Sequence, residues 1–454
     1  MPSLKLNKVK LFNYRCFSDT EIHFHPQLTV IIGDNGEGKT AILDAIATGF
    51  GVLLTRLPGI SGKNFDKATD LRISANKKQP FLRVTIETIE GICWDRTEKR
   101  DQSLATQKLI PKSLGTKALL NFVDTQIIDP FNEDRFFTMP VIVYYGTGRG
   151  VFDAPKNKTS FQKEFARFEA LTGALEGTAK FHALFQWIDA MEDRERRGMV
   201  KWEDNDFWVK AGSDQSLPEL NAVRLAIEKM MPGFTNPRVE IRPKRFVVDW
   251  KKSDSKQTYR IEQLSDGYRM TLAMVMDIAR RMAQANPDRK NILESEAIVL
   301  IDEVDLHLHP KWQQTILPDL MRTFPNTQFI VTTHSPQVLT TVPAKCLRSL
   351  QIETDTDTGK TQIGINLIKS ETLGTASIDT LAKVMGTDPI PDVPEARKLH
   401  QYHALIQQNQ HETDDGIKLR TELIAHFGIE HPVMLECERL IRLQALKGKL
   451  PVRG

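Results

Sequence analysis

Gly33-Asp34-Asn35-Gly36-Glu37-Gly38-Lys39-Thr40 is a complete phosphate-binding loop, and it follows directly on the apolar run from Leu28 to Ile32. Its glycines let backbone N–H groups curl around an anion, Lys39 can reach the β- and γ-phosphates, and the Thr40 hydroxyl can ligate Mg²⁺. The following residues, Ala41 to Phe50, are typical of a helix whose N-terminal dipole faces the phosphates. The order strand, loop, helix therefore predicts a nucleoside triphosphate site. Its expected binding residues are Gly33, Asn35, Gly36, Gly38, Lys39, Thr40 and Ala41.

The bulk composition fits a soluble protein with two or three structural units. The chain has 454 residues, of which 40% are hydrophobic and 26% charged, and its formal net charge is +3. So small a net charge does not by itself indicate a nucleic-acid-binding protein. The four cysteines form no Cys-x-x-Cys pair, and the sequence shows neither a signal peptide nor a membrane-spanning apolar run. We therefore expect a cytoplasmic protein without a disulfide framework or zinc site.

The N-terminal part alternates between strand and turn patterns. Residues 4 to 32 predict two strands, Leu4 to Phe12 and Leu28 to Ile32. The segments on either side of Gly91 predict an antiparallel hairpin in a β-subdomain. Pro140 to Tyr145 is typical of a buried strand, and it leads into the glycine-rich loop Gly146 to Gly150.

Apolar residues recur every three or four positions between residues 160 and 232, which predicts a helical insert. No heptad pattern is long enough for an extended coiled coil, so we expect the insert to pack on its own domain. A strand pair, Arg238 to Ile241 and Arg245 to Trp250, follows.

Two further apolar strands end in polar side chains. The segment Ala297 to Glu303 ends in two acids, of which Asp302 would hold the Mg²⁺ shell and Glu303 would polarise the attacking water. The alternative is that the acids stand there only because the strand end meets solvent. The segment Phe329 to Ser335 places His334 at the end of what would be the neighbouring parallel strand, where a neutral imidazole can hydrogen-bond the γ-phosphate.

The segment Leu264 to Arg269 opens a further helix, with Ser265 at the N-cap and Gly267 leaving backbone N–H groups open for a phosphate. The order of the motifs resembles that in the head domain of ATP-binding-cassette (ABC) ATPases: a phosphate loop, a Ser-Asp-Gly helix start, an acidic strand end and then a His. The resemblance implies an α/β fold: an ABC-type P-loop NTPase head with a mixed sheet and an antiparallel β-subdomain, an inserted helical region and a C-terminal helical tail.

The resemblance also implies roles for particular residues. In that family the serine–glycine signature contacts the γ-phosphate of ATP held by a second head, so Ser265 and Gly267 would act in trans and two ATP molecules would be sandwiched in a dimer. Asp305 matches the loop that crosses the dimer. The family's metal-contacting glutamine is not evident, and the loop Tyr145 to Arg149 lies where it is expected. Arg15 resembles an N-terminal arginine that contacts phosphate in recombination-type heads, although a surface arginine fits as well.

Three phrases look like the compact phage-defence and overcoming-lysogenisation-type ATPases. They are Asp305 to Gln313, Tyr144 to Arg149 and Phe329 to Pro336. The latter type carries a C-terminal nuclease, but here Asp355 to Gly359 reads as a turn. A nuclease-free head with a helical tail resembles the ATPase subunits (PtuA) of the Septu anti-phage system. This resemblance implies ATP and Mg²⁺ as cofactors, a homo-oligomer, and control of a separate HNH endonuclease, PtuB, with DNA bound through the complex.

The tail predicts three amphipathic helices, Pro394 to Gln408, Asp415 to Phe427 and His431 to Lys447. Their apolar faces would pack against the head or, alternatively, serve oligomerisation or a partner. In the third of these helices, Leu435 and Leu446 are expected to lie on the apolar face. The expected division is 1–150 for the N-terminal ATPase lobe, 151–235 for the helical insert, 236–370 for the C-terminal ATPase lobe and 371–454 for the tail.

Two alternatives to the Septu-type function stay open. One is a stand-alone DNA-repair ATPase of the RecF-like class, which would bind DNA through a basic face; its candidate residues are Arg238, Arg242, Lys244 and Arg245. The other is a nucleotide-sensing scaffold that does not hydrolyse ATP.

Overall fold

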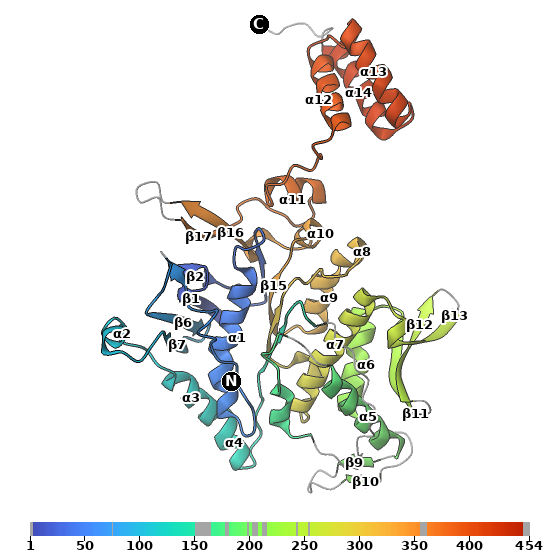
Figure 1. Cartoon of the computed structure of the whole chain (residues 1–454). Helices are drawn as coiled ribbons and strands as arrows, with labels where there is room; N and C mark the ends of the chain where they lie inside the picture. Colours follow the sequence, from blue (N-terminus) through green and yellow to red (C-terminus); the bar gives the residue numbers. More distant parts are fainter. Residues whose placement is uncertain are drawn as a thin grey trace. The chain divides into compact units, whose positions relative to one another are not determined.

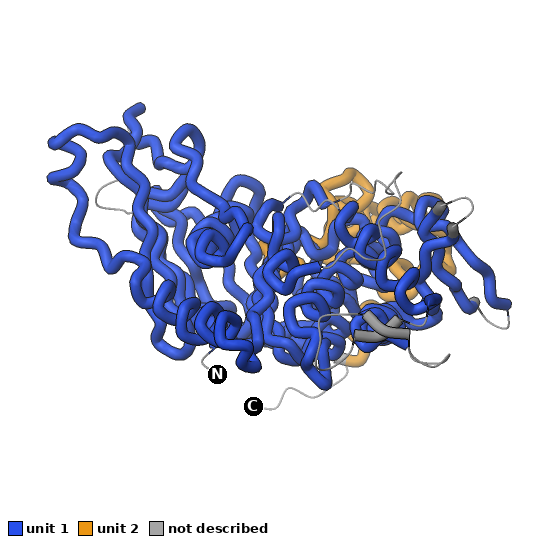
Figure 2. The backbone as a smooth tube through the Cα atoms, turned by 90° about the horizontal axis from the view of Figure 1, so that it is seen from below, with its two compact units in different colours: residues 1–380 blue, residues 381–454 orange. Residues whose placement is uncertain are grey.

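The computed structural model describes residues 3–74, 76–149, 165–177, 181–197, 199–201, 208–210, 216–241, 244–252, 255–354 and 361–447. The chain forms two compact units, residues 1–380 and 381–454 (Figure 2). The finer division of the first unit into two lobes and an insert stays a prediction. Within the described residues, no helix combines the length and apolarity needed to cross a membrane. The predicted turn from Asp355 to Gly359 lies outside the described residues.

A six-stranded sheet forms the centre of the first unit, in the order β17-β16-β3-β15-β14-β8. The five strands from β16 to β8 are parallel to their neighbours, and β17 is antiparallel to β16. All residues of β3, β8, β14 and β15 are buried, which explains why these strands read as continuous apolar runs. The strand bounds are β3 Leu28–Ile32, β8 Val141–Tyr145, β14 Ala297–Ile301, β15 Thr327–Thr332, β16 Leu347–Thr354 and β17 Thr361–Leu367.

A four-stranded antiparallel sheet, β2-β1-β6-β7, packs beside helix α1 (Lys39–Arg56) (Figure 1). Its strands are β1 Leu6–Tyr14, β2 Phe17–His23, β6 Phe81–Thr88 and β7 Cys93–Lys99. The predicted hairpin around Gly91 is confirmed as β6 and β7. The prediction of two strands before residue 32 was wrong, because β2 is a third. Its buried residues are Phe17, Thr20 and Ile22, so they do not alternate strictly and one of them is polar; both features weaken the apolar strand pattern.

The predicted insert is helical in α5 (His182–Arg196) and α6 (Pro218–Met230), and α6 packs along α7 (Asp266–Ala285). The structure adds a short hairpin between α5 and α6 and a third strand beside the predicted pair. These strands are β9 Met199–Lys201, β10 Trp208–Lys210, β11 Phe234–Ile241, β12 Lys244–Lys252 and β13 Ser255–Arg260.

Short elements complete the first unit. The two-residue strands β4 and β5 span Ile73–Ser74 and Lys77–Lys78; the helices are α2 Leu104–Lys108, α3 Lys117–Val123, α4 Asp129–Asn132, α8 Pro310–Gln313, α9 Ile316–Thr323, α10 Pro336–Leu339 and α11 Ser377–Lys383. The last helix runs across the boundary between the two units.

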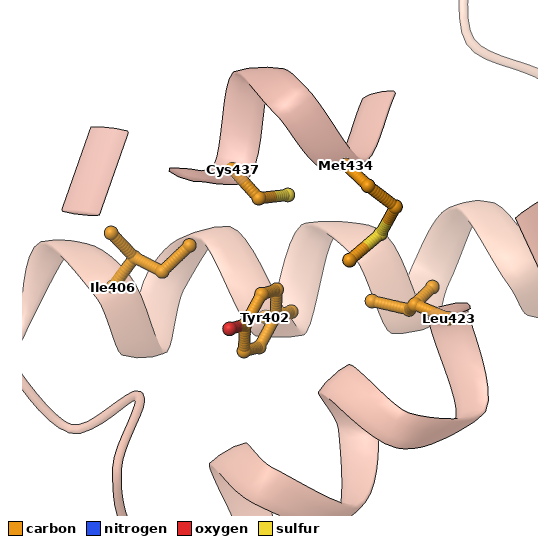
Figure 3. Close-up of a cluster of buried hydrophobic side chains, with 5 residues drawn as sticks. All are labelled: Tyr402, Ile406, Leu423, Met434 and Cys437. Atoms are coloured by element: carbon orange, nitrogen blue, oxygen red, sulfur yellow. The ribbon is translucent and has the colours of Figure 1, made fainter. Parts of the chain in front are cut away.

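The second unit holds the three predicted tail helices, α12 Pro394–Gln407, α13 Asp414–Phe427 and α14 Pro432–Lys447. Their buried side chains meet one another in a small core, drawn in Figure 3: Tyr402, Ile406, Leu423, Met434 and Cys437. The placement of Leu435 and Leu446 on the apolar face was wrong, since they are 51% and 59% exposed. The helix turns Met434 and Cys437 inward, and these two leucines fall outside that stripe.

A buried ionic network joins the edge strand β8 to helix α7. The Tyr145 hydroxyl donates to Asp277 Oδ2 at 2.9 Å, and Asp277 also accepts from Arg280 at 2.8 Å and Arg281 at 2.7 Å. Burial by itself would raise the pKa of Asp277, but the charges of Arg281 and Arg280 outweigh it and lower the pKa to about 2. Arg281 also donates to the carbonyl of Ala170 at 2.5 Å, which ties α7 to the start of the insert.

Replacing Asp277 with alanine leaves two guanidinium groups buried without their carboxylate. We expect Asp277→Ala to lower the free energy of unfolding by about 3 to 5 kcal/mol. The control is Asp193→Ala, which removes the exposed pair with Arg197 and is expected to cost about 0.3 to 0.5 kcal/mol. Urea unfolding followed by tryptophan fluorescence measures both. Equal effects of the two substitutions would contradict a structural role for the network.

Candidate functional site

The loop from Gly33 to Thr40 joins the carboxyl end of β3 to α1, and its shape requires glycine. Gly38 has φ +93°, and a Cβ atom there would lie 2.5 Å from Cys16 Sγ and 2.8 Å from Phe17 Cζ. The Asp34 N–H donates to the carboxylate of Glu37 at 2.6 Å, and Glu37 is itself buried. The loop is therefore held by one of its own side chains and by close contact with the start of β2.

Lys39 lies inside this loop and is 7% exposed. Its Nζ donates to the carbonyl oxygens of Gly33 and Asp34, both at 2.8 Å. Burial lowers the pKa of Lys39, while the negative charges of Glu37 and Asp302 oppose that shift. A positive charge is thus fixed against the loop, next to backbone N–H groups at a helix start, which is a favourable place for an anion.

Asp302, directly after β14, accepts hydrogen bonds from the first turn of α1 and from the end of β15. The Thr40 hydroxyl donates to Asp302 Oδ2 at 2.8 Å, and the Thr332 hydroxyl donates to Asp302 Oδ1 at 2.6 Å. The Glu303 N–H in turn donates to Thr332 Oγ1 at 2.7 Å. A hydroxyl and a carboxylate oxygen side by side are the hard oxygen ligands that Mg²⁺ prefers, so this donor set fits the expected metal.

Glu303 adopts a backbone conformation that non-glycine residues rarely take. Its φ is +47°, in the left-handed region; such geometry costs on the order of 1 to 3 kcal/mol and persists only where the surroundings impose it. The surroundings here include Arg149, which is 3% exposed and donates to the carbonyl oxygens of Asp302 at 2.6 Å and Glu303 at 2.7 Å. Sequence reasoning noted the loop that contains Arg149 but gave this arginine no role.

A cavity of about 380 Å³ opens at this edge of the sheet, and its lining includes most of the predicted site residues. The lining residues are Arg15, Cys16, Asn35, Gly36, Gly38, Lys39, Thr40, Ala41, Asp302, Glu303 and His334. Gly33, Ser265 and Gly267 are not among them. Strand β15, which leads to His334, is the parallel neighbour of β14, as predicted. Cys16 was not predicted; its nearness to Arg15 in the sequence was the available signal.

Arg15 lies at the edge of this cavity, with its charge already engaged. Its Nη1 donates to Asp44 at 2.8 Å and its Nε to Asp70 at 2.9 Å, and its φ is +47°. The side chain is 30% exposed, so it is not a freely solvated surface arginine. Contact with a phosphate, the other interpretation, stays a prediction.

Ser265 and Gly267 lie at the start of α7. Ser265 occupies the N-cap position but its side chain makes no capping hydrogen bond, and the residue is exposed. A Cβ atom on Gly267 would lie 2.4 Å from the carbonyl oxygen of His307, so the first turn of α7 packs tightly on the chain after Glu303. In that stretch Asp305 accepts a hydrogen bond from Thr333 Oγ1 at 2.5 Å. The serine therefore presents its hydroxyl outside its own chain's cavity.

The proposed basic face on β11 and β12 is largely neutralised where the structure describes it. Arg238 donates to Asp249 at 2.9 Å, and Arg245 donates to Glu240 at 2.5 Å. Arg242 and the side chain of Lys244 lie outside the described residues. Paired arginines of this kind do not make the strong positive patch that phosphate backbones attract.

Comparison with known families places two ATPase domain matches along this chain. Residues 8–231 match a family described as "AAA domain", and residues 192–340 match one described as "AAA domain, putative AbiEii toxin, Type IV TA system". Together these ranges contain the phosphate loop, the α7 start, the acidic strand end and His334.

Three relatives show how far the likeness extends. The chain is 28% identical to the Retron Vc95 probable ATPase of Vibrio cholerae serotype O1 biovar El Tor, over 76% of this chain and 73% of that one. It is 27% identical to the Retron Ec83 probable ATPase of Escherichia coli, over 95% and 86%. It is 25% identical to the Septu protein PtuA of Bacillus mycoides (strain KBAB4), over 73% of this chain but 38% of that protein. The chain is therefore an ATPase that matches two AAA domain families over parts of its length and is similar to the Septu PtuA proteins and to the ATPases of retrons.

Proposed function

We propose that this ATPase binds ATP with Mg²⁺ at the cavity lined by the phosphate loop, Asp302, Glu303 and His334, and that it works as a homo-oligomer in an anti-phage complex of the Septu type. The observation that carries the proposal is the hydrogen-bonded set Thr40, Asp302 and Thr332 facing the buried Lys39. Lys39, Thr40 and Asp302 line one cavity, where they supply a cation for the phosphates and oxygen ligands for a divalent metal.

Each residue has a distinct task in hydrolysis. Lys39 and the loop N–H groups hold the phosphates, while Thr40 and Asp302 hold the metal. Bound Mg²⁺ supplies charge neutralisation for the phosphates. Glu303 accepts a proton from the attacking water, and His334 donates a hydrogen bond to the terminal phosphate. Thr332 fixes the positions of Asp302 and Glu303 relative to each other, because its hydroxyl donates to the Asp302 carboxylate and accepts from the Glu303 N–H.

The second half of the site comes from another copy of the chain. Ser265 is exposed at the start of a 20-residue helix and is absent from the cavity lining of its own chain. An uncapped helix start with a free hydroxyl is suited to a phosphate, and a two-fold arrangement of two heads would bring it to the partner's nucleotide. Bound ATP then favours the closed pair of heads, and hydrolysis of the ATP lets the two heads separate.

The effector of the complex is a separate HNH endonuclease of the PtuB kind, acting in the cytoplasm, with DNA bound through the complex. Support comes from the likeness to the Septu protein PtuA and to the retron ATPases. Nucleotide-dependent pairing of the heads gives a physical route of control. An effector that binds one arrangement of the heads more tightly is bound or released as ATP changes the population of that arrangement. The neutralised face on β11 and β12 argues against DNA binding by this chain alone.

Glu303→Gln tests the proposed base. We expect turnover of ATP to fall by about 10² to 10⁴-fold while ATP is still bound, because the amide cannot accept the proton. Phosphate release and binding of a fluorescent ATP analogue measure the two properties separately. Glu228→Gln, an exposed glutamate on α6, is the control and should leave both unchanged. A wild-type chain without turnover would favour the non-hydrolysing scaffold, and full turnover in Glu303→Gln would refute the assigned base.

Ser265→Arg tests the site shared between two heads. A bulky cation at the shared phosphate position should abolish ATP-dependent assembly and most of the turnover, while ATP binding to single chains persists. Size-exclusion chromatography with light scattering, run with Glu303→Gln in the background to retain ATP, measures assembly. Ser216→Arg, at an exposed serine two residues before α6, is the matched control. Unchanged assembly and turnover in Ser265→Arg would contradict a two-head site.

A further inference from the structure

Arg149 is a buried arginine whose guanidinium donates, within the described part of the chain, to three backbone carbonyls, two of them at the end of the acidic strand. It is 3% exposed and donates from Nη1 to Asp302 O at 2.6 Å and to Gly146 O at 3.1 Å, and from Nη2 to Glu303 O at 2.7 Å. It does not line the nucleotide cavity. Its action on the chemistry must therefore pass through other residues.

Two of the three carbonyls that it binds belong to Asp302 and Glu303, which both line the cavity. Glu303 takes its left-handed conformation directly after Asp302, so a small rotation of either peptide unit would swing the Glu303 carboxylate. The planar guanidinium presents its donors in a fixed fork, which sets the two peptide units relative to each other. Lysine has no such fork, because its ammonium is a single point of charge.

The segment that carries Arg149 is itself anchored on the frame of the site. The Asp302 N–H donates to the Tyr145 carbonyl at 2.8 Å, and the Tyr145 hydroxyl donates to Asp277 of α7 at 2.9 Å. The strand β8 pairs in parallel with β14 up to Ile301 and Tyr145. Arg149 thus reaches the acidic strand end from a rigid base, with the signature helix α7 attached to the same base.

Burial makes this placement costly, which argues that it is not incidental. Burial lowers the pKa of Arg149, and the negative charges of Asp302, Glu303 and Asp305 work against that shift. A buried guanidinium is tolerated where its donors are satisfied and opposite charge is close. Both conditions are met here by the acidic strand end.

We propose that Arg149 is a positioning residue for ATP hydrolysis, holding the peptide units of Asp302 and Glu303 so that the Glu303 carboxylate faces the attacking water. The inference rests on the proposed role of Glu303. It gives the loop from Tyr145 to Arg149 a task of its own: to fix the base through the backbone, at the place where the ABC-type resemblance led us to expect a metal-contacting glutamine.

The test compares Arg149 with an arginine that makes similar contacts elsewhere. Arg167 donates to the carbonyls of Ala285 and Phe137, both at 2.9 Å, and does not line the nucleotide cavity. Arg149→Ala and Arg149→Lys should each lower kcat by about 100-fold and leave ATP affinity within about threefold, since a small misplacement of a catalytic group has an effect of that size. Arg167→Ala should change neither kcat nor ATP affinity, even where it lowers the melting temperature as much as the Arg149 substitutions do.

A second arm separates positioning of Glu303 from general damage. In the Glu303→Gln background, Arg149→Ala should lower the residual turnover by less than about threefold, because the group that it positions is gone. Thermal melting and binding of a fluorescent ATP analogue identify folded chains. The proposal is overturned if Arg149→Ala loses ATP affinity in step with kcat, if Arg149→Lys restores full turnover, or if the loss is as large in the Glu303→Gln background. Retained turnover in Glu303→Gln alone would instead refute the base assignment.

Discussion

The hydrogen bond from the Thr40 hydroxyl to the Asp302 carboxylate joins two motifs that lie 262 residues apart, and the rest of the site depends on it. Strand β15 lies between β3 and β14 in the sheet, and its last residue, Thr332, bonds to Asp302 from the other side. Parallel strands bring their carboxyl ends to one edge, so the carboxylate that follows β14 lies beside both the end of β15 and the helix start that follows β3. The strand order of the sheet thus sets the distances within the site.

The parts of the site that sequence reasoning found are those whose chemistry resides in side-chain type and spacing. The phosphate loop, Asp302, Glu303 and His334 each end or follow an apolar strand, and parallel pairing then places them together. Arg149 also follows an apolar strand, but two of its partners are the backbone carbonyls of Asp302 and Glu303, which lie 153 and 154 residues later. A local pattern does not reveal backbone partners at that separation. The third strand β2 was missed for a related reason: Thr20 is buried in the sheet without being apolar.

The two compact units each have their own buried core, and the two cores support different parts of the molecule. In the first unit, α7 carries the exposed Ser265 at one end and is fixed along its length by the network around Asp277. Because α7 is held rigidly, a contact that its exposed start makes with a second head can be transmitted along the helix to the sheet of its own head. In the second unit, three helices bury five residues against one another, so their apolar faces are already partly occupied. This leaves the exposed leucines of α14, Leu435 and Leu446, outside the small core.

The central claim is that a complete ATPase site needs two copies of the chain, one giving the phosphate loop and the other the start of α7. Lys39→Ala removes the first half and Ser265→Arg the second, so each variant alone should lack turnover. The most direct measurement mixes equal amounts of the two variants before ATP is added and follows phosphate release. Each mixed pair holds one intact site, so turnover in the mixture should rise well above that of either variant alone. A mixture as inactive as its components would contradict the shared site.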